Sequence, residues 1–115
     1  MTDRVLTATT HAHPAGPAVI SVAGELDYYT AAHLRQAVQE TAFTAEGVII
    51  DLTDLTYCDS TGITVLVTAY HRAQASKAPL ALVGLNPDLN RVFGIVGLHD
   101  VFASYPTVDE AVAAL

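Results

Sequence analysis

The sequence contains a single cysteine, Cys58, among its 115 residues. An intramolecular disulfide bond is therefore impossible, and so is any zinc or redox motif that needs two cysteines. Apolar residues make up 51% of the chain, which is enough for a hydrophobic core without a covalent cross-link. A chain of this length is predicted to form one domain that spans residues 1–115.

Long apolar runs are also missing from the sequence. No window reaches the roughly 18 continuous apolar residues that a membrane-spanning helix needs. The first residues lack the basic flank and apolar stretch of a secretion signal. We therefore expect a cytoplasmic protein that has no membrane partner.

Positive charge is scarce in this chain. Five Lys and Arg residues face twelve Asp and Glu residues, which gives a formal net charge of −7. A surface of this sign repels the phosphate backbone of nucleic acids. No direct nucleic-acid partner is expected, whereas a basic patch on another protein would suit this charge. The five histidines are scattered, and no metal site is predicted from them.

The hydrophobic pattern predicts alternating strands and helices. We expect strands at residues 5–9, 18–23, 48–52, 80–85 and 101–104. We expect helices at residues 30–42, 61–76, 87–96 and 108–115. Good capping residues, Thr30, Asn86 and Thr107, precede three of these helices, and Gly97 follows the third one.

The order of these segments predicts the architecture. The loop at residues 11–17 contains two prolines and a glycine, so the first two strands are expected to pair as a hairpin. The run at residues 48–52 is apolar apart from Asp51, as is typical of a central strand that is covered on both faces. Alternation from there onward predicts right-handed strand–helix–strand units. The fold class is therefore α/β, with a mixed sheet of about five strands and about four helices packed on it.

The chemically informative segment is Asp51–Ile63, where the central strand gives way to a helix. Ligands of open α/β sheets bind at strand ends of this kind. Asp59, Ser60 and Thr61 are all good capping residues, so the residue types alone also fit a purely structural role at the helix start. The two interpretations stay open at this level.

Three motifs of this chain resemble the STAS domain family. Gly24-Glu-Leu-Asp27 ends the second strand, Asp51-Leu-Thr-Asp-Leu55 ends the third, and Asp59-Ser-Thr-Gly-Ile63 opens a helix. Together they are similar to the bacterial branch of anti-sigma factor antagonists. The resemblance covers nearly the whole chain and implies a binding protein, not an enzyme, with no cofactor and no metal.

The resemblance also implies a role for each residue of the segment. Ser60 corresponds to the serine that an anti-sigma factor, itself a serine kinase, phosphorylates. The unphosphorylated form binds that kinase, the phosphorylated form lets go, and a serine phosphatase resets the switch. Asp27 and Asp59 correspond to acidic positions beside the acceptor, while Thr61 and Gly62 complete the phosphorylation and partner-binding loop.

Two positions depart from the family pattern. Tyr28 and Tyr29 stand where at least one more polar residue is usual. We expect one ring to pack on the core and the other to be exposed, and a role of the pair in contacting a partner stays open as the alternative. Cys58 stands where an apolar residue is common. A phosphatase-type cysteine would need an arginine six residues later, and position 64 is Thr, so we interpret Cys58 as a small buried residue.

Two alternative functions remain open from the sequence. A STAS domain can also serve as a module of another signalling or transport assembly. Ser60-Thr-Gly-Ile-Thr64 in turn partly resembles the phosphate loop of flavodoxin-like proteins, in which N–H groups at a helix start bind a ligand phosphate. That loop follows the first strand of such folds, whereas this one follows the third.

Overall fold

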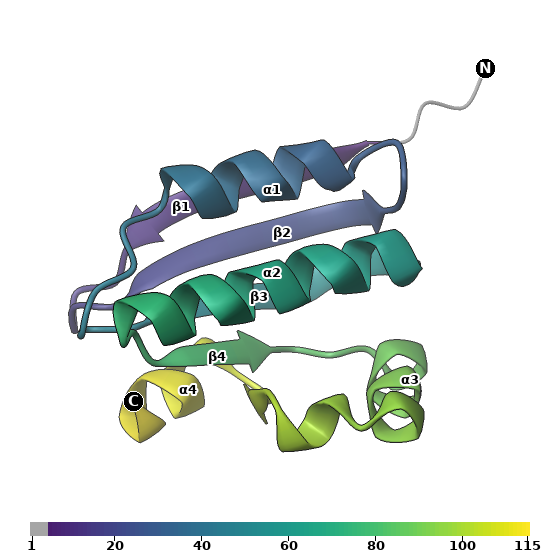
Figure 1. The fold of residues 1–115 in the computed structure, drawn as a ribbon. Coiled ribbons are helices and arrows are strands. Elements are labelled where there is room, and N and C mark those ends of the chain that lie inside the picture. Colours follow the sequence, from purple (N-terminus) through teal and green to yellow (C-terminus); the bar gives the residue numbers. More distant parts are fainter. Residues whose placement is uncertain (1–4) are drawn as a thin grey trace.

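A computed structural model describes residues 5–115 as one five-stranded sheet with its helices packed against it (Figure 1). The strands are β1 (Leu6–Ala12), β2 (Ala18–Leu26), β3 (Val48–Cys58), β4 (Leu80–Val83) and β5 (Ala103–Tyr105). The helices are α1 (Ala31–Glu40), α2 (Ser60–Ser76), α3 (Pro87–Val96) and α4 (Val108–Ala114), with a short 3₁₀ helix at Leu98–Asp100. The predicted α/β architecture is confirmed.

The strands lie side by side in their sequence order. β1 and β2 are antiparallel and form the predicted hairpin, whereas β2 to β5 are all parallel to their neighbours. The carboxyl ends of these four parallel strands therefore meet at one end of the sheet.

Helices cover both faces of the sheet, but unequally. On one face, side chains of α1, α2 and α3 pack with Ile20, Val48 and Ile50 in the larger core. On the other face, α4 covers a small core that contains Val19 and Ile49. Neighbouring residues of β3 thus point into different cores, which explains why its first part is continuously apolar.

Several boundaries differ from the sequence-based expectation. β3 continues to Cys58, although a polar stretch was expected after residue 52, because β3 keeps pairing with β2 through two register shifts as far as Leu26 and Cys58. β1 extends to Ala12, and β4 already ends at Val83. The last strand begins at Ala103 because the unpredicted 3₁₀ helix and a turn occupy residues 98–101.

Most of the predicted caps are confirmed. The Asn86 side chain accepts a hydrogen bond from the Leu89 N–H at 2.8 Å, and the Thr107 hydroxyl accepts one from the Glu110 N–H at 3.1 Å. Gly97 ends α3 with φ +79°, a left-handed conformation that favours glycine. The prediction that Thr30 caps α1 is wrong, because the Thr30 hydroxyl donates to the Glu25 carbonyl at 2.7 Å.

Candidate functional site

Three segments meet at the carboxyl end of the parallel strands. These are the loop between β2 and α1 (residues 27–30), the end of β3 and the start of α2. Figure 1 shows the tip of β2, the start of α2 and helix α3 at this same end of the molecule. This is where ligands and partners of open α/β sheets bind.

Asp59 joins two of these segments. Its Oδ1 accepts a hydrogen bond from the Gly62 N–H at 3.1 Å, which caps α2, and its Oδ2 accepts one from the Tyr28 N–H at 3.3 Å. The Asp59 N–H in turn donates to the Leu26 carbonyl at 3.1 Å. One carboxylate therefore fixes the start of α2 to a loop that lies some thirty residues earlier in the chain.

Ser60 follows this cap as the first residue of α2 and is exposed to solvent. Within residues 5–115, its hydroxyl has no hydrogen-bond partner, whereas its carbonyl accepts a bond from the Thr64 hydroxyl at 3.0 Å. Thr61 is half-buried. Because Asp59 has taken over the capping, Ser60 is not needed for that purpose, and its hydroxyl is accessible for chemistry.

Gly62 is buried where α2 crosses the end of the sheet. A Cβ atom at this position would lie 2.6 Å from Leu26 Cγ and 2.8 Å from Cys58 Sγ. Only glycine allows the helix start to approach β2 and β3 this closely. Gly62 thus sets the position of the serine through packing.

Asp27 lies in the loop beside Asp59, but the structure buries it to 3% exposure. Its Oδ1 accepts hydrogen bonds from the N–H groups of Tyr29 at 2.9 Å and Thr30 at 3.1 Å. The Asp27 carboxylate is therefore buried under the loop that Asp59 holds, and its part beside the acceptor stays a prediction. The buried carboxylate stabilises the loop by accepting hydrogen bonds from its backbone N–H groups.

Tyr28 and Tyr29 are both exposed, at 74% and 77%. Their rings contact each other edge to face, with 5.5 Å between the centroids. The expectation that one of them packs on the core is wrong. The buried side chain of this loop is Asp27, so both tyrosines remain on the surface.

Cys58 is half-buried and packs against the larger core, which supports its interpretation as a structural residue. Burial, and secondarily the negative charge of Asp59, raises the pKa of the Cys58 thiol from 9.0 to about 12. The thiol is thus protonated at neutral pH, although a helix N-terminus often lowers such a pKa. A nucleophilic role does not fit this environment.

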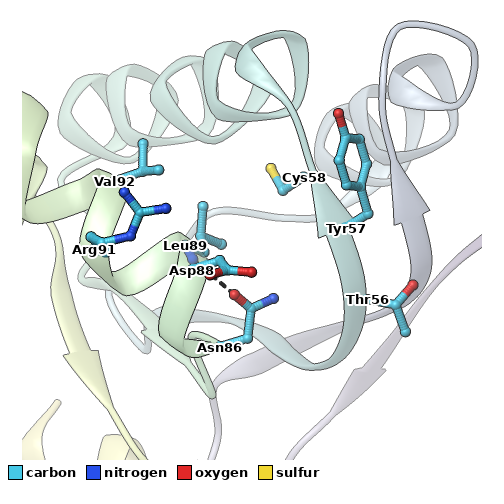
Figure 2. A pocket seen from close by; sticks show the side chains of 8 residues that line it. All are labelled: Thr56, Tyr57, Cys58, Asn86, Asp88, Leu89, Arg91 and Val92. Carbon is cyan, nitrogen blue, oxygen red and sulfur yellow. Dashed lines mark hydrogen bonds between the residues drawn. The ribbon is translucent and has the colours of Figure 1, made fainter.

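A pocket of about 250 Å³ lies between the end of β3 and helix α3, and Cys58, two residues before Ser60, is part of its lining. Figure 2 shows Tyr57 and Cys58 on the β3 side and Leu89, Arg91 and Val92 on the α3 side. The contribution of α3 to this end of the sheet was not predicted from the sequence. The signal was available, since α3 follows β4, a parallel strand that ends at the same edge of the sheet.

Residues 5–115 contain neither a clustered metal site nor a membrane-spanning helix. No group of three or more His, Cys, Asp or Glu side chains is arranged to bind a metal ion there. Nor does that part of the chain contain a helix with the length and apolar character needed to cross a membrane.

Comparison with known proteins assigns the family. Residues 8–111 match the STAS domain. The chain belongs to the STAS domain family. The sheet of this chain has the strand order β1-β2-β3-β4-β5, whereas flavodoxin-like sheets have the order 2-1-3-4-5. The flavodoxin-like alternative is therefore wrong.

The similar proteins include several anti-sigma factor antagonists. The anti-sigma-B factor antagonist of Listeria monocytogenes is 43% identical over 84 residues, which cover 71% of this chain and 73% of the relative. The corresponding protein of Bacillus subtilis is 35% identical, with 71% and 75% covered. The crystal structure of an anti-sigma factor antagonist from Mycobacterium paratuberculosis superposes with a TM-score of 0.85 at 30% identity, covering 96% of this chain and 93% of that one.

The tight packing of Gly62 in this STAS domain yields a prediction about stability. Gly62→Ala is expected to lower the free energy of unfolding by up to about 2 kcal/mol, because overpacking against Leu26 and Cys58 costs about 1–3 kcal/mol and the gain in helix propensity returns about 1 kcal/mol. Urea denaturation measures the change.

Gly94→Ala is the matched control for this substitution. Gly94 also lies in a helix, but a Cβ there would meet only His99, at 3.7 Å. This control is expected to stabilise the protein by up to about 1 kcal/mol. Equal stability changes for the two variants would contradict the packing role of Gly62.

Proposed function

We propose that the protein is an anti-sigma factor antagonist that works by binding and not by catalysis. Its unphosphorylated form binds an anti-sigma factor that is also a serine kinase, and phosphorylation of Ser60 ends this binding. A serine phosphatase restores the binding form. The observation that carries the proposal is the exposed hydroxyl of Ser60 at the start of α2, which has no hydrogen-bond partner among residues 5–115, in a chain similar to anti-sigma factor antagonists.

Each residue of the motif has a part in this proposal. Ser60 is the phosphate acceptor. Asp59 caps α2 and ties it to the loop before α1, so that the serine is presented in a fixed position. Thr61 and Gly62 form the first turn behind the acceptor, and Asp27 supports the neighbouring loop from the interior.

A phosphoryl group on Ser60 is compatible with the fold. It adds about −1.5 to −2 charges at a residue that points to solvent. At a helix N-terminus the peptide dipoles favour an anion by roughly 0.3–2 kcal/mol. The neighbouring Asp59 carboxylate opposes the new charge, but it is already engaged with two N–H groups. We therefore expect the core to be unchanged by phosphorylation.

At an interface the same group is unfavourable. A kinase that phosphorylates Ser60 must bring a catalytic carboxylate and nucleotide phosphates close to this hydroxyl. After the transfer, the dianion faces these groups and Asp59, and like-charge juxtaposition at an interface costs several kcal/mol. Since each 1.4 kcal/mol changes the affinity tenfold, the charge at residue 60 decides whether the partner stays bound.

The first prediction concerns the site of modification. Incubation with ATP and purified anti-sigma factor kinases is expected to add one phosphoryl group to the wild type and none to Ser60→Ala, because Ser60 has the accessible hydroxyl. Intact-mass analysis and peptide mapping measure the product. Thr61→Ala is the matched control and should be modified like the wild type. Undiminished phosphorylation of Ser60→Ala would refute the assignment.

The second prediction concerns binding. Ser60→Asp is expected to weaken the complex with the anti-sigma factor at least tenfold, whereas the neutral variant Ser60→Asn should have a smaller effect. Calorimetric titration gives the affinities, and thermal unfolding should show equally stable folds. If both variants bind like the wild type, charge at residue 60 does not control the complex.

A further inference from the structure

Three exposed tyrosines belong to the segments that meet at the start of α2. Tyr28 and Tyr29 belong to the loop that Asp59 holds against the start of α2. Tyr57, which is 48% exposed, precedes Ser60 by three residues, so their Cα atoms are at most about 11 Å apart. In residues 5–115, no other tyrosine is classed as exposed, since Tyr70 and Tyr105 are half-buried.

The backbone beneath these rings is held in place. The Tyr28 N–H donates to the Asp59 carboxylate and the Tyr29 N–H donates to the buried Asp27 carboxylate. Tyr57 lies in β3, opposite Glu25 of β2. The rings therefore extend into solvent from a backbone that is already ordered. This reduces the conformational entropy that the loop would lose when a partner binds.

The exposed rings supply a substantial part of an interface. A tyrosine or other aromatic side chain can bury 150–250 Å². At exposures of 74%, 77% and 48%, the three rings together offer about 300–500 Å². One partner of a standard protein complex buries about 800 Å², so these tyrosines could provide about half of that area.

Three carboxylate side chains lie on the strands around Tyr57 or in the lining of its pocket. Asp54 is exposed on β3, Glu25 is half-buried opposite Tyr57, and Asp88 lines the same pocket as Tyr57. Arg91 is the one basic residue in the lining of that pocket. The surroundings of the tyrosines are therefore net acidic, in agreement with the formal charge of −7 for the chain.

We infer that Tyr28, Tyr29 and Tyr57 are the anchors by which this protein docks on its partner, and that the partner presents apolar pockets rimmed by arginine. Tyrosine is enriched among the residues that dominate binding energy. Guanidinium groups pack on tyrosine faces and pair with carboxylates, so an arginine rim matches both kinds of side chain found here.

This inference rests on the proposed function, because it describes the partner of the same site. It is also consistent with release on phosphorylation. The arginine rim faces the carboxylates at the periphery, whereas the kinase groups that repel a phosphate face Ser60 at the centre. The tyrosine pair further explains why the chain departs from the family pattern at residues 28–29, since the two rings add contact area on this partner.

The test measures binding of tyrosine variants to purified ATP-binding anti-sigma factors of the source organism. ADP is present, so that no phosphoryl transfer occurs. The variants are Tyr28→Ala, Tyr29→Ala and Tyr57→Ala. At least two of them are expected to bind about ten- to thirtyfold more weakly than the wild type, mainly because the complex dissociates faster. Asp54→Asn should instead slow association and reduce its dependence on salt.

Leu115→Ala is the control, because Leu115 is 40% exposed and lies at the opposite end of the sheet (Figure 1). It should bind within threefold of the wild type, and all variants should unfold at unchanged temperature. If the wild type binds an anti-sigma factor and every tyrosine variant loses less than threefold in affinity, the inference about the tyrosines is wrong, but the proposed function still stands. Absence of binding to any anti-sigma factor overturns the proposed function as well. Concentration-dependent self-association that the tyrosine variants abolish would assign the surface to a second copy of the chain.

Discussion

The Asp59 carboxylate is the interaction on which the geometry of this site depends. It uses one oxygen to cap α2 at Gly62 and the other to hold the Tyr28 N–H, so two separate parts of the chain share one anchor. Asp59, the residue before Ser60, provides the cap of α2. The exposed Ser60 hydroxyl is therefore not needed to cap the helix. A serine in the capping position itself would be engaged with the backbone and less available for modification.

The residues around Asp59 fall into two groups, buried residues that stabilise the fold and exposed residues that a partner can contact. Gly62 and Asp27 are buried, one to let α2 approach the sheet and the other to satisfy N–H groups of the loop. Ser60 and the adjacent tyrosines are exposed. Under the proposed function, a change of charge on the exposed groups would act on what can dock, while the buried groups would maintain the fold. This separation suits a protein that is switched without being unfolded.

The sequence predicted the order of the elements because their patterns are strong and local. The apolar run at Val48–Leu52 predicts a strand, and this strand is confirmed. The capping residues Asn86 and Thr107 predict helix starts, and both caps are confirmed. The full length of β3 was missed, since its second half has a polar pattern and is a strand only through irregular pairing with β2.

The predictions that failed at the site concern side chains whose surroundings come from distant segments. A carboxylate such as Asp27 is expected on the surface, and here its burial is offset by N–H groups that the turn of the loop brings to it. With that aspartate inside, both Tyr28 and Tyr29 lie outside. Neither outcome is visible from residue types, and the contribution of Arg91 and its helix likewise requires the spatial arrangement of strand ends.

The most direct measurement is amide hydrogen exchange at Tyr28 and Gly62, compared between the wild type and Asp59→Ala. If one carboxylate ties the two segments together, both amides should exchange faster in the variant, while Asp59→Asn, which retains an acceptor oxygen, should show a smaller effect. Exchange at Tyr28 that stays unchanged while Gly62 accelerates would show that the loop does not depend on Asp59, and the account of a shared anchor would be wrong.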